Sequence, residues 1–541
     1  MSAHDLNSHG SDAPSVSTRS FTRVERRSID YVPRSERHGK AWHLWPVWFC
    51  GDAHLTTLAV GVIGASMGSN LFWSAIAIVG GSTFGTFFMA AHSAQGPHMG
   101  LPQLIQSRPQ FGYVGVLLVF VVALATYIGY NVFNQKLAGQ TFEDSLGFNT
   151  TATQLTFTAL ALVMAFFGYQ WFHKIQRYLS FVLIAAMVIY TVYVVGFGAF
   201  PDGQLSTHGF SATPFLAQFF TAAAYQLSWA IYVSDYSRYL PYEVNTRATF
   251  WWTYAGAGVG GAWMMLIGAC AAAMFPSLNV AEALIHSGDR LFPGFGVTLA
   301  VLAVIGLITS AAQNFYGASL TILSAVDSFK PIHATLMKRF VSLLVAGAMA
   351  IGIAATANQD FMTEFGSFLA IMLYLFTPWT AVNLVDYYLV RRGYYSIREI
   401  FNPRGMYGRW DWRGIAAYLI GFLVMVPFFV TVWWTGPIAQ WLGGADVAMV
   451  PGLLVAAGFY ALVCRSVDLD GERRRVAVLD AGLEEFGVTG SAVVDDDGHP
   501  VKYTVDHEFS LPEPNSLEKL SAAGHAPDKR ESPPFQRGEG R

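Results

Sequence analysis

Two side chains in the apolar run of residues 113–139 have the types and the spacing to bind a planar ring. Tyr130 and Asn134 stand four positions apart, so a helix places them on one face. An aromatic side chain stacks on the face of a heterocycle, at about 1–3 kcal/mol per base, and an amide pairs with the donors and acceptors on its edge. This pair therefore indicates a site for a flat, neutral, polar molecule.

Two other apolar runs carry polar and aromatic side chains that are unusual for a surface facing lipid. The first set is Tyr225, Gln226, Ser228, Trp229 and Tyr232, and the second is Thr309, Ser310, Gln313, Asn314, Tyr316 and Ser319. For any one of these residues, hydrogen bonding between neighbouring helices is an equally good interpretation. Three such sets on three different helices favour a central polar cavity.

Asp52 is an acid inside the first apolar run, where a charge is costly and is normally retained for a reason. Gly51 beside it suits a helix that breaks, and a broken helix offers backbone carbonyls to an ion or a substrate. Asp52 is therefore a candidate for binding substrate, cation or proton. The alternative is a packing or gating residue in a water-filled vestibule. For His54 nearby, a buried, hydrogen-bonded imidazole is the commoner finding.

The charge distribution shows which elements must hold these residues. The chain has 541 residues and is 53% hydrophobic but only 13% charged, about half the usual share. Only 31 of its 69 formal charges fall within residues 47–464. We therefore expect a membrane domain at 47–464 between two cytoplasmic tails, 1–46 and 465–541, of which the second is largely disordered.

The same composition excludes several classes of protein. The apolar body has no basic run, which argues against nucleic acid as a partner. The three cysteines, Cys50, Cys270 and Cys464, have no metal-binding spacing and form no disulfide framework. The sequence therefore predicts no cofactor. An embedded enzyme would need a nucleophile, a metal site or an acid/base pair with a third partner, and a channel would need a repeated filter motif; neither pattern is present.

Apolar runs of about 18 or more residues predict membrane-spanning helices. We expect twelve, at 47–69, 71–94, 113–139, 151–168, 177–199, 213–235, 249–274, 294–323, 338–357, 361–389, 414–435 and 447–464. With the N-terminus inside, 31 of the 33 basic residues lie on the cytoplasmic side. Because positive loops stay in the cytoplasm, both termini are predicted to be cytoplasmic in a multi-pass protein of the plasma membrane.

Three segments resemble the nucleobase:cation symporter-1 family, the purine-cytosine permeases. They are GPHMGLPQLIQSRPQFGY (96–113), SWAIYVSDYSRYLP (228–241) and FTPWTAVNLVDYYLVRRGYY (376–395). The resemblance extends over about residues 45–465. It implies ten core helices in two inverted five-helix repeats, followed by two extra C-terminal helices. It also implies that the first and sixth helices are discontinuous, and that substrate binds between them and the third and eighth helices.

The resemblance also implies roles for individual residues. Trp229 matches the aromatic side chain that covers the base, while Asn134 and Asn314 match polar positions that hydrogen-bond it. Three positions depart from the pattern: Tyr130 where many members have Trp, Asp52 where fungal members tend to have Asn, and Gln313 where those have Pro. These departures indicate that the substrate preference differs from that of the fungal members.

Thr309 and Ser310 fall where bacterial members of the family place the hydroxyls of a sodium site. The resemblance thus favours sodium as the coupling cation, with a proton on Asp52 as the alternative. The expected function is import of a purine, cytosine or related neutral heterocycle by cation symport with alternating access. Permeases of the same fold that carry hydantoin, allantoin, thiamine or pyridoxine-like compounds are the alternative, and a channel or an enzyme is disfavoured.

Overall fold

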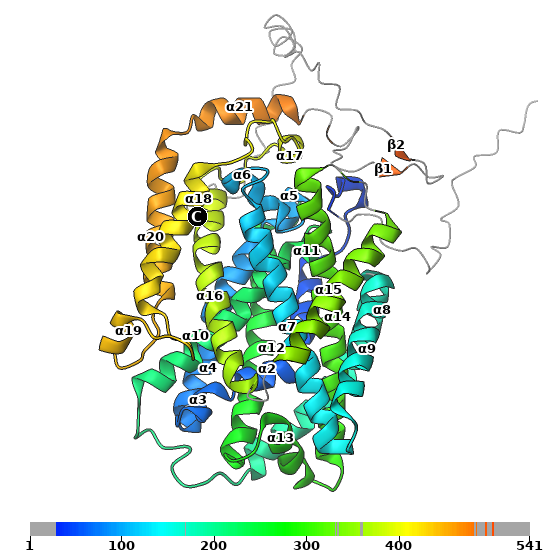
Figure 1. The fold of residues 1–541 in the computed structure, drawn as a ribbon, viewed down its shortest axis with the longest axis vertical. Helices are drawn as coiled ribbons and strands as arrows, with labels where there is room; N and C mark the ends of the chain where they lie inside the picture. The colour runs from blue at the N-terminus through cyan, green and yellow to red at the C-terminus, as the bar shows by residue number, and fades with distance from the viewer. Residues whose placement is uncertain are drawn as a thin grey trace, which may run out of the picture.

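Long helices dominate the structure, and most of them run along one common direction (Figure 1). The computed structural model describes residues 29–167, 169–330, 332, 335–357, 361–480, 483, 493–494 and 500–501. Eight helices in this part are long and apolar enough to cross a membrane, or nine when one bent pair counts as a single span. The predicted all-helical membrane protein is confirmed at this level. Two short strands of two residues each, β1 (Val493–Val494) and β2 (Pro500–Val501), pair antiparallel.

Each predicted apolar run contains helical residues. The main helices are α1 (Leu44–Gly51), α2 (Leu55–Val60), α3 (Ile63–Ser66), α4 (Leu71–Ser93), α7 (Leu117–Leu146), α8 (Thr150–Phe167), α9 (Tyr169–Phe197), α10 (Ala212–Ser228), α12 (Thr246–Met274), α14 (Phe295–Phe329), α15 (Leu336–Thr356), α16 (Phe361–Val385), α18 (Trp412–Met425) and α20 (Met449–Val463). Shorter helices connect them: α5 (Gly96–Met99), α6 (Arg108–Phe111), α11 (Val233–Ser237), α13 (Val280–Asp289), α17 (Ile397–Ile400), α19 (Pro437–Trp441) and α21 (Leu469–Leu479).

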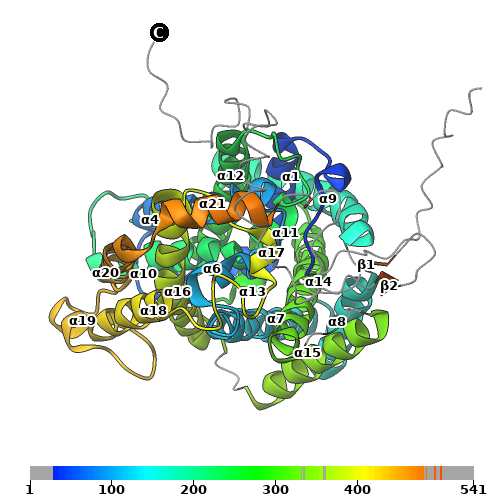
Figure 2. The ribbon, with the colours of Figure 1, turned by 90° about the horizontal axis from the view of Figure 1, so that it is seen from above.

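The bundle has two distinct ends. One carries α5, α6, α17 and α21 and is called the α21 end here, and the opposite end carries α3 and α13 (Figure 1). Seen along the bundle, α18 and α20 lie at one edge, while α8 and α15 lie at another (Figure 2). The most extensive helix contacts are those of α4 with α10, α7 with α14, and α4 with α12. The polar residues singled out in the sequence therefore lie on helices at the core of the bundle.

Two of the predicted spans are interrupted. The first bends by 70° between α1 and α2, where Asp52, Ala53 and His54 are non-helical. The sixth stops as an α-helix at Ser228, makes a 3-10 turn over Trp229–Ile231, and resumes as α11. Both breaks lie in the helices for which the family resemblance implies discontinuity.

A close helix crossing holds the first broken span in place. A Cβ atom added at Gly268 of α12 would lie 2.0 Å from the carbonyl oxygen of Leu58 in α2. At Gly61, just after α2, it would lie 1.9 Å from the carbonyl oxygen of Met265. Glycine at these positions lets the two backbones touch, so α12 fixes the position of α2 beside the break.

Among the spans that differ from their predicted bounds, two do so for a clear local reason. The third continues to Leu146, seven residues beyond the predicted end, and stops where Gly147 adopts a left-handed conformation (φ 68°). The α-helix of the eleventh ends earlier than predicted, at Met425, because Pro427 has no N–H for the helical hydrogen bond; a 3-10 turn over Val426–Phe428 follows.

Segments from both tails pack on the α21 end. The predicted 465–541 tail begins with helix α21, and Ile29 and Val32 of the predicted 1–46 tail are buried. The backbone N–H of Val32 donates to the carbonyl oxygen of Gly100, at 2.9 Å. Most of the segment predicted to be disordered lies outside the described residues.

Candidate functional site

A small cavity lies where the two breaks meet α7 and α14. Its free volume is only about 10 Å³, so it is nearly closed in this structure, and it is lined by His54, Thr126, Tyr130, Asn134, Tyr225, Ser228, Trp229, Tyr232, Ser310 and Asn314. These residues come from the first break, from α7, from the end of α10 with the turn after it, and from α14. The structure thus brings together residues from all four helices that the sequence singled out.

Aromatic rings form much of the cavity wall. Tyr225 contacts both Tyr130 and Trp229 edge to face, with ring centroids 6.1 Å and 6.0 Å away. The Tyr130 hydroxyl and the Ser228 hydroxyl are 2.9 Å apart, which fixes one edge of the Tyr130 ring. Trp229 also contacts Trp48 edge to face, at 5.9 Å. Several aromatic faces and edges therefore meet at this site, and they would have to move apart to admit a flat ligand.

Buried amides supply polar atoms beside this wall. The Asn134 side-chain oxygen accepts a hydrogen bond from Thr56 Oγ1 at 2.6 Å, while its Nδ2 has no hydrogen-bond partner among the described residues. Asn314 lines the same cavity from α14. Because buried polar groups are nearly always paired, the Asn134 amide is available to donate to a ligand.

Three predicted substrate contacts lie outside the lining residues. Asp52 is 2% exposed, and its Oδ2 accepts a hydrogen bond from Gln226 Nε2 at 3.3 Å. This pair lies against α12, where a Cβ at Gly261 would be 1.8 Å from Gln226 Nε2. The third is Gln313, which neighbours the lining residue Asn314 and is also buried. Oxygen atoms of all three, Asp52 Oδ1, Gln226 Oε1 and Gln313 Oε1, lack partners in the described part of the chain.

The two predicted cation ligands lie next to the first break. Thr309 Oγ1 donates to the carbonyl oxygen of Gly306 at 2.7 Å, and Ser310 lines the cavity. A Cβ at Gly306 would lie 2.8 Å from the Ala53 carbonyl oxygen, so this turn of α14 contacts the broken segment directly. Hydroxyl and carbonyl oxygens of this kind suit a hard cation such as sodium.

Sequence reasoning missed two residues of this region. Thr126 lines the cavity one turn before Tyr130, so the same i, i+4 spacing could have revealed it. Thr56 is buried and bonded to Asn134, and it has no distinguishing signal in the sequence.

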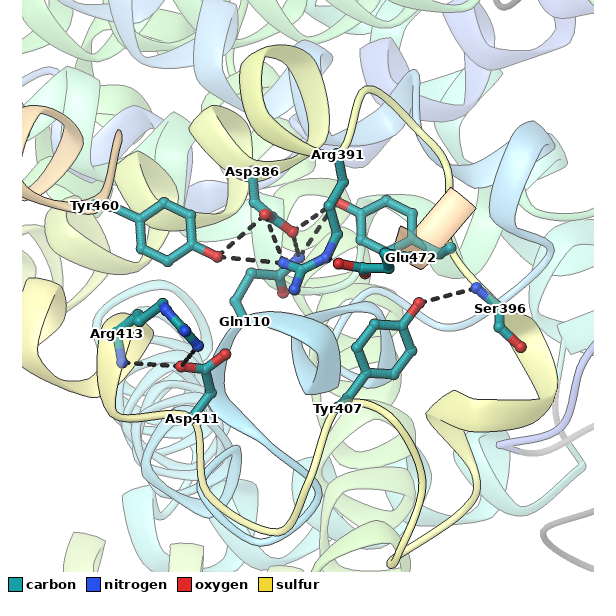
Figure 3. Close-up of polar contacts among 10 residues, drawn as sticks. Gln110, Asp386, Arg391, Ser396, Tyr407, Asp411, Arg413, Tyr460 and Glu472 are labelled. Atoms are coloured by element: carbon teal, nitrogen blue, oxygen red, sulfur yellow. Dashed lines mark hydrogen bonds and ion pairs between the residues drawn. The ribbon is translucent and has the colours of Figure 1, made fainter. Parts of the chain in front are cut away.

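Figure 3 shows a second polar cluster, whose labelled residues do not line the cavity. Asp386, directly after α16, accepts hydrogen bonds from Gln110 (2.7 Å), Tyr395 (2.8 Å) and Tyr460 (3.1 Å). Arg391 forms ion pairs with Asp386 and with Glu472 of α21, both at 2.7 Å. The cluster therefore connects two of the resembling segments, 96–113 and 376–395, with α20 and α21.

Comparisons with known proteins agree with this fold. Residues 31–447 match the sequence profile of a family described as a permease for cytosine/purines, uracil, thiamine and allantoin. A protein of Bacillus subtilis described as a putative purine-cytosine permease is 35% identical over 446 residues, which cover 82% of this chain and 96% of that one. A purine-cytosine permease of Emericella nidulans is 25% identical over 460 residues, 81% of this chain and 87% of its own.

Solved structures show the same fold. Mhp1, a nucleobase-cation-symport-1 family transporter, has a closed conformation with bromovinylhydantoin bound that superposes with a TM-score of 0.68. The match covers 84% of this chain and 99% of Mhp1, at 16% identity. The inward-facing conformation of Mhp1 gives 0.64, at 18% identity and with the same coverage. On the family match and the 35% identical relative, the chain belongs to the nucleobase:cation symporter-1 family of cytosine and purine permeases.

Proposed function

We propose that this transporter imports a purine, cytosine or related neutral heterocycle by cation symport, and that the heterocycle binds in the central cavity. The observation that carries the proposal is the meeting of stacking rings and an unsatisfied amide in one buried space. Relatives named as purine-cytosine permeases support this substrate class. A channel or an enzyme is not supported by these relatives.

In this proposal, Tyr130 and Trp229 stack on the two faces of the ring. Asn134 and Asn314 then bind the polar atoms on its edge, because they line the same cavity. Gln226 and Gln313 lie beside the lining residues, and their unpartnered oxygens would complete the set after a small side-chain rotation. Hydrogen-bonding sites of this kind discriminate strongly between related ligands, since a missing partner leaves a buried group unpaired.

The proposed coupling cation is sodium, held by Thr309, Ser310 and carbonyl oxygens of the first break. The contact between Gly306 and Ala53 supports this arrangement, because it brings hydroxyls and carbonyls to one place. In this proposal sodium binds more tightly to the outward-open state, which is the state that binds substrate. Sodium binding therefore raises the population of that state. Protonation of Asp52 is the alternative coupling step, and its unpartnered Oδ1 is the observation that favours it.

The proposed topology has twelve membrane-spanning helices, with α18 and α20 as the two that follow two inverted five-helix repeats. The transporter domain is 47–464, and the α21 end faces the cytoplasm together with both termini. The excess of basic residues in the loops at that end supports this orientation. The bilayer in question would be the plasma membrane.

The test is a thermal-shift screen of the purified protein against a panel of heterocycles, with and without sodium. The panel includes cytosine, purines and uracil. It also includes hydantoins, allantoin, thiamine and pyridoxine, which the alternative permeases of this fold would carry. A ligand that binds only the folded state raises the melting temperature with its concentration. We expect a purine or cytosine to stabilise, more so with sodium. If only one of the other compounds stabilises the protein, that compound and not a purine or cytosine is the substrate.

A further inference from the structure

A second cavity, larger than the central one, opens on the outside of the bundle between α4, α12 and the end of α16. Its volume is about 420 Å³. Its walls are apolar: Phe87 from α4, Phe250 and Trp251 from α12, and Leu389 after α16. Phe87, Trp251 and Leu389 are 51%, 60% and 63% exposed, so the groove opens to the surroundings. It takes no part in the proposed substrate site.

The groove exists because its floor has small side chains. Ala91 of α4 and Ala94 directly after it line the groove and are buried, whereas the neighbouring walls are aromatic. The Tyr388 hydroxyl donates to the Ala91 carbonyl oxygen at 2.7 Å, which ties the end of α16 to α4 along the floor. From Phe87 to Ala94 the groove follows α4 for about 10 Å, at 1.5 Å per residue.

Two arginines border this groove. Arg247, the second residue of α12, lines the groove and is exposed. Arg392 donates from Nε to the carbonyl oxygen of the lining residue Leu389, at 3.3 Å, which keeps its guanidinium at the border of the groove. Neither arginine forms an ion pair in the described part of the chain, and the acid nearest to Arg247 in sequence, Glu243, is exposed. The N-terminus of the 29-residue helix α12 adds partial positive charge.

We propose that this groove binds an anionic phospholipid, with an acyl chain along Phe87, Phe250 and Trp251 and the phosphate on Arg247 and Arg392. An apolar channel bordered by cations is complementary to such a lipid and not to a soluble anion. The planar guanidinium fork binds phosphate oxygens in pairs. Assigning the lipid to the cytoplasmic leaflet, which is the anionic one, depends on the orientation proposed above.

The test measures lipid binding directly. Purified, delipidated full-length protein is titrated in detergent with phosphatidylglycerol or with phosphatidylcholine of the same acyl chains, and thermal stability is followed. We expect phosphatidylglycerol to stabilise at an at least fivefold lower concentration. In the double variant Arg247→Gln/Arg392→Gln this preference should disappear. Arg290→Gln, which removes a cation near the opposite end of the bundle, should retain it.

Two further measurements distinguish binding of a phospholipid from binding of a soluble phosphate. Inorganic phosphate or glycerol phosphate at equal concentration should give no stabilisation, and Trp251→Ala should weaken the binding of phosphatidylglycerol. The proposal is overturned if the two lipids stabilise the wild type equally, if the double variant keeps the preference, or if the soluble phosphates replace the lipid. If the double variant does not fold, Arg247→Lys/Arg392→Lys is expected to keep part of the preference. None of these readouts depends on transport substrate, so they are independent of the proposed function.

Discussion

Trp229 reaches the central cavity because the helix that carries it stops one residue earlier. Its 3-10 turn rotates the side chain away from the phase of α10, and Trp48, Tyr225 and Tyr232 contact it on several sides. A side chain held by so many rings loses little further freedom when a ligand stacks on it. Much of the stacking energy is therefore available for binding.

Trp229→Ala should remove this stacking while leaving the edge contacts in place. At about 1–3 kcal/mol per stacked base, the affinity falls by about 5- to 150-fold. The measurement is substrate binding by the purified variant, together with uptake into proteoliposomes. Trp433→Ala, at an exposed residue far from the cavity, is the matched control and should bind normally. Normal binding by Trp229→Ala would refute the stacking role.

A pair of substitutions separates the two proposed coupling cations. Ser310→Ala removes a hydroxyl beside the first break, so we expect the sodium concentration for half-maximal uptake to rise by about tenfold, equivalent to about 1.4 kcal/mol. Asp52→Asn keeps the shape of the side chain and should leave the sodium dependence unchanged. The opposite pattern is an unchanged sodium dependence in Ser310→Ala together with loss of gradient-driven uptake in Asp52→Asn. That result would assign the coupling to a proton on Asp52.

Among the elements, the crossing of α2 and α12 is the most sensitive contact that supports the site. Gly268→Ala would place a methyl group where the Leu58 carbonyl oxygen lies 2.0 Å away, so the backbones must separate. Overpacking of this kind costs about 1–3 kcal/mol, and it also shifts the break that carries Asp52. We expect a lower melting temperature and weaker substrate binding.

Gly458→Ala in α20 is the matched control for that variant. A Cβ there meets no atom within 4 Å, and alanine favours the helix more than glycine does. The control should therefore melt at or above the wild-type temperature. Equal melting of the two variants would show that the α2–α12 crossing tolerates separation.

The loop before α20 contains a carboxyl group whose titration should affect stability. Burial raises the pKa of Asp446 to about 6, although hydrogen bonds from the Tyr374 hydroxyl and the Ala448 N–H oppose this shift. In the unfolded chain the pKa is about 3.9, so between these values the folded state binds more protons. Stability contributed by this group is therefore lost as the pH rises from about 4 to 6, by about 3 kcal/mol.

The measurement compares unfolding of the wild type and Asp446→Asn between pH 4.5 and 7.5. Asn cannot titrate, so the variant should lose less stability over this range. Tyr374→Phe removes one of the opposing hydrogen bonds and should move the transition to higher pH. An identical pH dependence in the wild type and Asp446→Asn would contradict the assignment.

At the scale of the whole molecule, the sequence predicted the helices and part of the site. Apolar run lengths and helical spacing predict which residues share a helix face, and Tyr130 and Asn134 do line one cavity. The spacing could not show that Trp229 lines the cavity while Gln226 does not, because the α-helix stops between them and the side chains no longer follow its periodicity. It also could not reveal the cluster around Asp386, whose partner Gln110 is 276 residues away.

The same long-range cluster attaches the C-terminal helix α21 to the transporter domain. Asp480 accepts hydrogen bonds from the Ser396 hydroxyl and the Ile397 N–H, both at 2.8 Å, at the start of α17. Glu472 pairs with Arg391, which in turn pairs with Asp386. Because α17 would lose partners for its first N–H groups, α21 should contribute to the stability of the whole bundle.

Two truncations test this attachment. Ending the chain after Leu483 keeps α21 and Asp480, so we expect an unchanged melting temperature. Ending it after Val467 removes the Arg391–Glu472 pair and the bonds to Asp480. Since hydrogen bonds to charged groups contribute about 1.5–3 kcal/mol each, this chain should melt at a clearly lower temperature and be cleaved faster by protease within 391–400. Glu472→Gln should fall between the two. Equal melting of both truncated chains would show that α21 rests on the bundle without stabilising it.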